Sequence, residues 1–258
     1  QVTLATLWQS EEERQALRPL AAIGVEIVAQ PLTQRRSLWN CLQALPSQAP
    51  IQAAYCWQPS FAQQLRRLVV ERAFDIIHVE HLRGVRYGLT LKATLAAAGL
   101  PVPIIWDSVD CISHLFAQAA THSRSRAGRF MTRLELERTR RYEGWLLTQF
   151  DQVLVTSPSD RQALLALATA RTHRGQTPQE CINPIAVLPN GVDLEQFQAQ
   201  GANKAEKTLV FSGKMSYHAN VTAALHLVEE IMPHVWATDP AVQVQLVGKD
   251  PPARLRAL

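Results

Sequence analysis

The amino-acid sequence predicts an α/β protein built on parallel β-sheet. Short apolar runs rich in β-branched residues alternate with longer stretches whose apolar residues recur every three or four positions. Such alternation of strands and helices is typical of parallel sheets. The 258 residues are 47% apolar and 19% charged. This composition suits a globular chain with a buried core and excludes intrinsic disorder and coiled coil.

Eight short runs are predicted to be strands. Pairs such as Ile76-Ile77 and Ile104-Ile105 lack polar–apolar alternation, which indicates strands that are covered on both faces of a doubly wound sheet. In chain order the predicted strands are Val2–Leu7, Val25–Ala29, Asp75–Val79, Pro103–Trp106, Gln152–Thr156, Ile185–Leu188, Thr208–Ser212 and Val242–Val247.

Six helices are predicted between these strands. The last of them carries apolar residues at every third or fourth position, which is the stripe of a helix packed on a sheet. The predicted helices are Glu11–Ala22, Ser60–Glu71, Val85–Ala98, Ala127–Thr148, Ser159–Ala168 and Asn220–Trp236.

A polar stretch without periodicity, residues 189–207, divides the chain. We predict a Rossmann-like N-terminal domain over residues 1–188, an interdomain linker over 189–207, and a second Rossmann-like domain that starts with a new βαβ unit over 208–258. Two strands and little more than one helix do not enclose a core. The chain also begins at a predicted strand and ends in what resembles the first turns of a further helix, so we expect a fragment whose second domain is incomplete.

Charge and cysteine content exclude several classes of protein. The 26 basic and 22 acidic residues leave a net charge of +4, which is too small to indicate a nucleic-acid partner. The four cysteines form no C-x-x-C pair, a pattern that argues against a disulfide scaffold or zinc site and suits a reducing cytoplasm. No apolar run approaches the ~20 residues that span a bilayer. The expected location is cytoplasmic.

Five short motifs stand at predicted strand ends, and together they resemble those of glycosyltransferase family 4, the group 1 glycosyltransferases. They are Phe-Asp-Ile-Ile-His-Val (74–79), Phe-Asp-Gln-Val-Leu-Val-Thr-Ser (150–157), Pro-Asn-Gly-Val-Asp (189–193) with Phe197, Phe-Ser-Gly-Lys-Met (211–215) and Leu-Val-Gly-Lys (246–249). Within the family, residues 213–221 and 248–252 are most similar to the sugar transferases of exopolysaccharide and PEP-CTERM export systems.

The resemblance implies a GT-B fold, in which two Rossmann-like domains face each other across a cleft. It implies a retaining, metal-independent glycosyltransferase without cofactor. This enzyme moves a sugar from a UDP- or GDP-type nucleotide-sugar to a glycan or lipid-linked acceptor in cell-surface polysaccharide synthesis. Independently, the sequence lacks the D-x-D motif of metal-dependent sugar transferases. The family's first strand and glycine-rich loop would precede Gln1, and its E-x7-E segment would follow Leu258, so the fragment itself is expected to be inactive.

The predicted donor-phosphate residues follow the first strand of the second domain, where an α/β sheet binds ligands. The resemblance implies that Gly213 lets the backbone approach the diphosphate and that Lys214 neutralises it. A strand-to-helix turn and a solvated lysine are the structural alternatives. His218 and Asn220 are candidates to replace the second cation of the family, and Asn220 is predicted to serve instead as the N-cap of the following helix.

The predicted acceptor-side residues follow two other strands. Glu80 and His81 end the strand at 75–79, and residues at the carboxyl end of a parallel strand face the ligand crevice. His78, inside this strand, is predicted to be a core histidine. The H-x-E spacing is not followed by the P-C-x-x-C of zinc deaminases, so that interpretation is excluded.

Asp107 and Asp110 follow the next strand and are candidates for orienting an acceptor hydroxyl. Helix capping by Asp110 or Ser113 has equal weight. No residue is assigned as a catalytic base, because in a front-face retaining transfer the leaving phosphate itself takes the acceptor proton.

The remaining predictions concern turns. Asn190, Gly191 and Asp193 are predicted to form the hinge between the domains, in a turn that uses a positive φ at Gly191. Ser157 is predicted to be a helix N-cap.

The segment Arg124–Arg141 contains seven arginines. A basic amphipathic helix here could make a peripheral contact with the inner face of the plasma membrane. The interleaved Glu135, Glu137 and Glu143 favour a solvated helix face with pairs such as Glu137–Arg141.

Three alternative functions remain open at this stage. One is a GT-B enzyme that epimerises nucleotide-sugars, and another is a non-catalytic Rossmann-type binding module. The third, an NAD(P)-dependent oxidoreductase, is disfavoured because no G-x-G-x-x-G follows any predicted strand.

Overall fold

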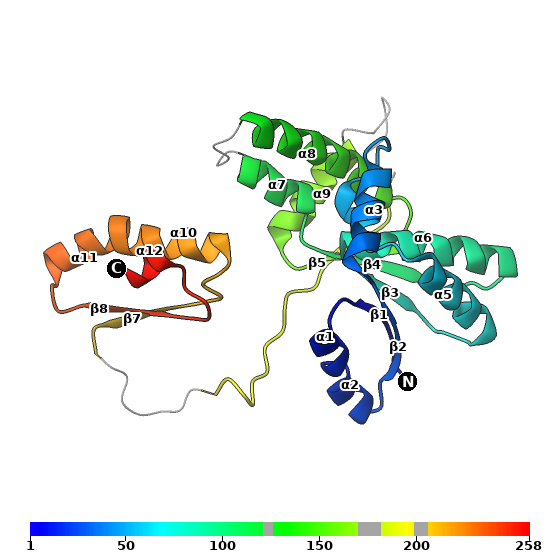
Figure 1. Cartoon of the computed structure of the whole chain (residues 1–258), viewed down its shortest axis with the longest axis horizontal. Helices are drawn as coiled ribbons and strands as arrows, with labels where there is room; N and C mark the ends of the chain where they lie inside the picture. Colours follow the sequence, from blue (N-terminus) through cyan, green and yellow to red (C-terminus); the bar gives the residue numbers. More distant parts are fainter. Residues whose placement is uncertain (121–125, 170–181, 199–205) are drawn as a thin grey trace. The chain divides into compact units, whose positions relative to one another are not determined.

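The computed structural model describes residues 1–120, 126–169, 182–198 and 206–258. The chain divides into two compact units, Gln1–Gly191 (the first unit) and Val192–Leu258 (the second unit), which are described separately (Figure 1). Every strand pairing in the described residues is parallel. The predicted α/β class with parallel sheet is therefore confirmed.

All eight predicted strands are present, but they do not form one sheet in the first unit. The described strands of this unit form a two-stranded sheet, β1-β2, and a four-stranded sheet in the order β3-β4-β5-β6. Their bounds are β1 (Thr3–Trp8), β2 (Glu26–Pro31), β3 (Ile77–Glu80), β4 (Ile104–Val109), β5 (Gln152–Val155) and β6 (Ile185–Val187).

The helices of the first unit include three that the sequence pattern did not predict: α3, α4 and α7. The predicted helix at 11–22 is divided in two, because Pro19 starts a new helix in its first turn. The helices are α1 (Glu11–Gln15), α2 (Arg18–Ala22), α3 (Gln34–Ala44), α4 (Ile51–Tyr55), α5 (Pro59–Glu71), α6 (His81–Ala98), α7 (Ile112–Ala120), α8 (Arg126–Leu146) and α9 (Pro158–Thr169).

Helix α5 links the two sheets of the first unit. Near its start, Ser60 and Gln64 hydrogen-bond to Gln30 at the end of β2. After its end, Arg72 binds Glu26 at the start of β2 at 2.6 Å. Helix α5 therefore runs antiparallel to β2, and the chain that leaves it enters β3 in the direction of β2. The strands of both sheets thus run the same way.

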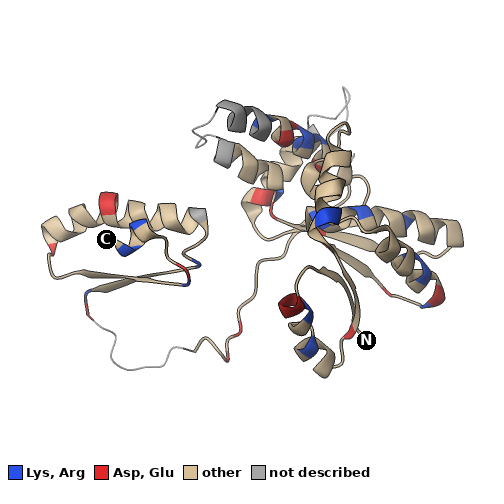
Figure 2. Cartoon of the chain, in the orientation of Figure 1, with Lys and Arg blue, Asp and Glu red and all other residues tan. Residues whose placement is uncertain are grey.

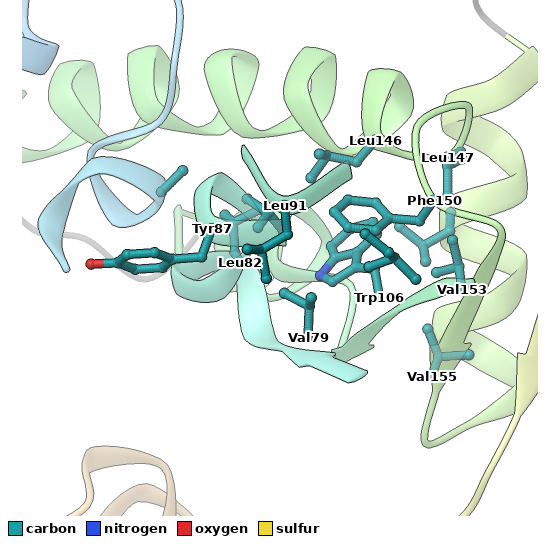
Figure 3. Close-up of a cluster of buried hydrophobic side chains, with 14 of the residues drawn as sticks. Val79, Leu82, Tyr87, Leu91, Trp106, Leu146, Leu147, Phe150, Val153 and Val155 are labelled. Atoms are coloured by element: carbon teal, nitrogen blue, oxygen red, sulfur yellow. The ribbon is translucent and has the colours of Figure 1, made fainter. Parts of the chain in front are cut away.

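The core of the first unit lies between the four-stranded sheet and helices α5, α6, α8 and α9 (Figure 3). Trp106 of β4 and Phe150 are fully buried, with ring centroids 6.0 Å apart. Helix α6 comes so close that a Cβ on Gly88 would lie 2.7 Å from the Phe150 ring. Only glycine permits this approach, which fixes α6, and with it the end of β3, against the sheet.

The second unit is a single βαβ arrangement. Strands β7 (Thr208–Ser212) and β8 (Gln243–Val247) are parallel neighbours. Between them lie α10 (His218–His226), a π-helical turn (Leu227–Ile231) and α11 (Met232–Thr238), and α12 (Ala253–Arg256) follows. The predicted helix at 220–236 is present, with a π-turn inside it. One small cluster of buried residues packs the helices on the sheet: Met215, Val221, Ala224 and Leu255.

Candidate functional site

Three titratable side chains share one open face at the carboxyl ends of β3 and β4. Glu80 and Asp107 are directly paired in the parallel register, and His78 lies two residues before Glu80. Because alternate residues of a strand point to the same face, His78, Glu80 and Asp107 lie together. We call residues 78–81 and 107–113 the crest. The structure thus brings together two of the predicted acceptor-side residues from different strands.

His78 was predicted to be a core residue, and this prediction is wrong. Its side chain is 48% exposed, and its Nε2 lies 3.4 Å from Asp107 Oδ2. The reason is the position of β3 at the edge of its sheet, where Val79 is buried while His78 and Glu80 face outward. For the same reason Ile76 is half exposed, so β3 is not covered on both faces. The alternation His-Val-Glu was the signal for this arrangement.

The backbone of the crest is strained at two non-glycine residues. The register between β4 and β5 shifts between Asp107 and Val109, which is a β-bulge, and Val109 has φ 63°. His81 has φ 60° at the start of α6. A β-branched residue in the left-handed region is a rare outlier, and bulges and strained residues concentrate at functional sites. This strain marks the crest independently of its side-chain chemistry.

A hydrogen bond from its own loop fixes the side chain of Asp107. Its Oδ1 accepts a hydrogen bond of 2.9 Å from the backbone N–H of Val109. Ser108, fully buried at the bulge, donates its hydroxyl to the carbonyl of Asp110 at 2.8 Å. The second oxygen of Asp107 is the one near His78. The carboxylate is therefore fixed in orientation, with one oxygen directed to the open face.

Two carboxylates from other helices hold the loop that follows Asp110. Glu143 of α8 accepts the N–H groups of Ile112 and Ser113 at 2.8 and 3.1 Å. Asp160 of α9 accepts the N–H of Cys111 at 2.9 Å. These three N–H groups would otherwise be orphan donors at the start of α7. The predicted capping by Asp110 or Ser113 is therefore replaced by capping from α8 and α9.

Glu143 was predicted to belong to a solvated helix face, and this prediction is wrong. The residue has no exposed surface. Burial raises the pKa of the Glu143 carboxyl, and the hydrogen bonds from Ser113 and Ile112 oppose that rise. On the outer side of α8, Glu137 pairs with Arg140 at 3.0 Å. No pattern in the sequence distinguishes the buried glutamate from its exposed neighbours.

Ser157 is the N-cap of α9, as predicted. Its hydroxyl accepts the N–H of Asp160 at 3.1 Å and also binds the Asp160 carboxylate. The N-cap hydroxyl therefore fixes the same carboxylate that holds the N–H of Cys111.

The thiol of Cys111 is expected to be unreactive in the folded protein. It is 1% exposed, and burial raises its pKa to about 11. Since the thiolate is the nucleophile, iodoacetamide at pH 8 should modify Cys111 roughly a hundredfold more slowly in the native chain than in urea. Mass spectrometry of the alkylated peptides measures both rates, with the half-buried Cys41 as the internal comparison. Native modification of Cys111 as fast as that of Cys41 would contradict the burial of this loop.

The predicted donor-side residues lie at the carboxyl end of β7 in the second unit. Gly213 donates its N–H to Val247 at 3.0 Å, and a Cβ on Gly248 would lie 1.8 Å from the Gly213 carbonyl oxygen. Lys214 is exposed. His218 starts α10, and its side chain lies outside the described residues. The two strand ends therefore approach so closely that Gly248 has no room for a side chain.

Asn220 is not the N-cap that was predicted. The N-cap of α10 is Tyr217, and Asn220, one turn into the helix, donates its amide to the Lys214 carbonyl at 3.1 Å. The amide nitrogen of Asn220 lies only 2.8 Å from the position that a Cβ on Gly213 would occupy. Asn220 thus fixes the Gly213–Lys214 turn from inside the helix.

The predicted hinge residues are exposed. Gly191 does not adopt the predicted positive φ. Among the described glycines, only Gly24 and Gly99 have a positive φ. The turn starts later, where Asp193 Oδ1 accepts the N–H groups of Glu195 and Gln196 at 2.9 and 3.0 Å. An aspartate turn therefore replaces the expected glycine turn.

The arginine-rich segment is described only in part. Arg124 lies outside the described residues, and the side chains are described from Arg133 onward. No helix of the described ranges is both long enough and apolar enough to cross a bilayer.

Two hollows of the surface lie away from the predicted donor and acceptor residues, and the first includes Arg140 and Arg141 of the arginine-rich segment. A hollow of about 660 Å³ in the first unit is lined by residues 48–49 and by α8 side chains such as Tyr142 and Trp145. Another of about 700 Å³ lies along α10 and α11 in the second unit. Among the side chains that the structure describes, no three His, Cys, Asp or Glu residues stand close enough to hold a metal ion.

The crest therefore brings Glu80 and Asp107 together with His78, which sequence reasoning assigned to the core, and His81 follows Glu80 at the start of α6. Asp110 belongs to the same loop through its backbone. Comparison of the whole chain with protein-family models and with curated proteins gave no match.

Proposed function

We propose that this chain is part of a retaining, metal-independent glycosyltransferase that takes its sugar from a UDP- or GDP-linked donor. The acceptor is a glycan or lipid-linked sugar of cell-surface polysaccharide synthesis. The observation that carries the proposal is the crest, where His78, Glu80 and Asp107 share an open face beside two strained non-glycine residues. The sequence motifs at five strand ends give the class of reaction.

The charge of the crest suits a neutral, hydroxyl-rich ligand rather than a phosphate. Glu80 and Asp107 present carboxylates, which accept hydrogen bonds from sugar hydroxyls and repel anions. The start of α7, where a helix N-terminus would attract an anion, is already occupied by Glu143 and Asp160. The acceptor is therefore assigned to the crest, with Asp107 orienting the hydroxyl and His78 beside it.

The donor diphosphate is assigned to the turn at Gly213–Lys214. Here the Asn220 side chain packs against Gly213 and fixes the turn, and the exposed Lys214 supplies the positive charge. In transfer with retention, the bond between the anomeric carbon and the phosphate oxygen breaks while the acceptor oxygen bonds to the same face. The proton of the acceptor hydroxyl passes to the departing phosphate oxygen, so the chain supplies orientation and charge rather than a base.

Titration calorimetry with UDP- and GDP-sugars tests the donor assignment. Lys214→Gln should weaken binding of the responding nucleotide-sugar about tenfold, because a charge-assisted contact with phosphate is lost. Lys207→Gln is the matched control, since Lys207 lies at the opposite end of β7 and pairs with Asp239 at 2.9 Å. Equal loss in the two variants, or no heat from any nucleotide-sugar, would refute the assignment. Conversion of the donor without acceptor would favour epimerisation instead.

A further inference from the structure

Helix α3 buries two polar residues together with Ala44 and exposes its large apolar residues. Ser37 and Asn40 are buried at 1% and 3% exposure. Leu38, Trp39 and Leu42 are exposed at 64%, 53% and 51%. This is the reverse of a surface helix in a globular protein, whose apolar stripe faces the core. The inverted pattern needs an explanation outside the first unit itself.

Buried hydrogen bonds fix this orientation. The Asn40 amide donates to the carbonyls of Tyr55 and Trp57 at 3.1 and 2.7 Å, and Thr33 caps the helix through the N–H of Arg36 at 3.2 Å. Turning the helix to bury its leucines would leave these carbonyls unpaired in the interior, which is costly. The apolar side chains are therefore held outward as a preformed surface.

The outer face is continuous and has a positive end. Arg35, Leu38, Trp39 and Leu42 follow the i, i+3, i+4, i+7 spacing of a single helix face, and Leu45, 45% exposed, extends it past the end of the helix. We call these five residues the α3 face. A tryptophan and leucines headed by an arginine form the pattern of a helix that lies in a membrane interface.

The charge near the α3 face is mainly positive: from α8, Arg138 donates to the Leu45 carbonyl, and the mostly buried Glu135 pairs with that arginine. Residues 27–70 contain four arginines, Arg35, Arg36, Arg66 and Arg67, and neither an acidic residue nor a lysine. In Figure 2, α3 accordingly carries arginine colouring only. A second copy of the chain on this face would place the arginines of both copies together across a twofold axis, which like-charge repulsion opposes. An anionic surface is attracted by the same charges.

We propose that the α3 face docks the first unit on an anionic lipid surface. Leu38, Trp39 and Leu42 enter the interface between head groups and acyl chains, while Arg35 stays at the level of the phosphates. Arg138 of the segment 124–141 donates to the Leu45 carbonyl and so lies beside this face. The proposal does not depend on the proposed transferase activity.

Vesicle flotation of the full chain tests the proposal. The wild type should float with vesicles of equal parts phosphatidylcholine and phosphatidylglycerol and remain unbound with phosphatidylcholine alone. The double variant L38S/L42S should bind at least about tenfold more weakly, because the apolar area that enters the interface is lost. The matched control is I23S/V70S, which removes two exposed apolar side chains elsewhere in the first unit and should bind as the wild type does.

A second measurement locates the contact without relying on the variants' stability. Brominated lipids quench only tryptophans that enter the bilayer interface, so they should quench part of the wild-type emission and none of it in Trp39→Phe. Unchanged flotation of L38S/L42S, quenching that persists in Trp39→Phe, or failure to bind either vesicle would overturn the proposal. A concentration-dependent dimer in sedimentation that L38S/L42S abolishes would assign the face to a second copy and overturn it too.

Discussion

Replacing Glu143 by alanine is expected to lower the free energy of unfolding of the first unit by about 2–4 kcal/mol, because two buried N–H groups lose their acceptor. These are the groups of Ile112 and Ser113, which Glu143 binds at 2.8 and 3.1 Å from a neighbouring helix. Water does not compensate readily, since Glu143 and Ser113 are buried. Urea unfolding followed by circular dichroism measures the change.

Glu143→Gln is the control for charge, and it predicts a pH dependence. Burial raises the carboxyl pKa above the ordinary value of 4.5, so the folded chain binds this proton more tightly than the unfolded chain does. The stabilisation from the proton is complete below pH 4.5 and is lost as the pH rises through the raised pKa. The wild type should therefore lose stability relative to Glu143→Gln over that range. A difference that does not change with pH would show that the carboxyl is not buried.

Replacing Phe150 by alanine should cost about 3–5 kcal/mol of unfolding free energy, which is the usual cost of deleting a buried aromatic ring. Phe150 is fully buried, packs on Trp106 at 6.0 Å, and is the surface against which Gly88 brings α6. The cavity would lie directly beneath the sheet that carries the crest (Figure 3).

Two comparison variants make the Phe150 prediction specific. Phe150→Leu keeps most of the volume and should cost about 1 kcal/mol, because volume-conserving changes in a core are tolerated. Phe197→Ala removes the same ring from a side chain that is 68% exposed and should change the stability by less than about 0.5 kcal/mol. Equal stability of Phe150→Ala and Phe197→Ala would contradict the packing of α6 on β3 and β4 described above.

The strands could be predicted because short, β-branched runs are local signals. Thr208–Ser212 was predicted with its correct bounds. Glu80 and Asp107 were each placed after a predicted strand, and they lie side by side because parallel strands end at the same edge of a sheet. Their pairing follows from the register of β3 and β4, the two strands that α6 connects. The sequence therefore predicted which residues lie at the crest better than it predicted what surrounds them.

The errors have a common physical origin, which is that the partner of each group lies far away in the chain. The carboxylate of Glu143 stands on a charged helix, and its N–H donors lie about 30 residues earlier, beyond any periodic pattern. Helix α3 was not predicted because its polar residues face inward, so its apolar stripe did not indicate packing on a sheet. His78 was misplaced because the edge position of β3 is a property of the whole sheet.

The small core of the second unit has a thermodynamic consequence. Its described residues contain one buried cluster of four side chains, with Met232 buried in addition, whereas the first unit has a cluster several times larger. Units with separate interiors need not melt together, so a calorimetric trace of the chain should contain two endotherms, with the smaller at lower temperature. A molecule that binds only the native form of one unit raises the melting temperature of that unit, and the shift grows with the logarithm of the ligand concentration. Scanning calorimetry thus shows which of the two units an unknown small molecule binds.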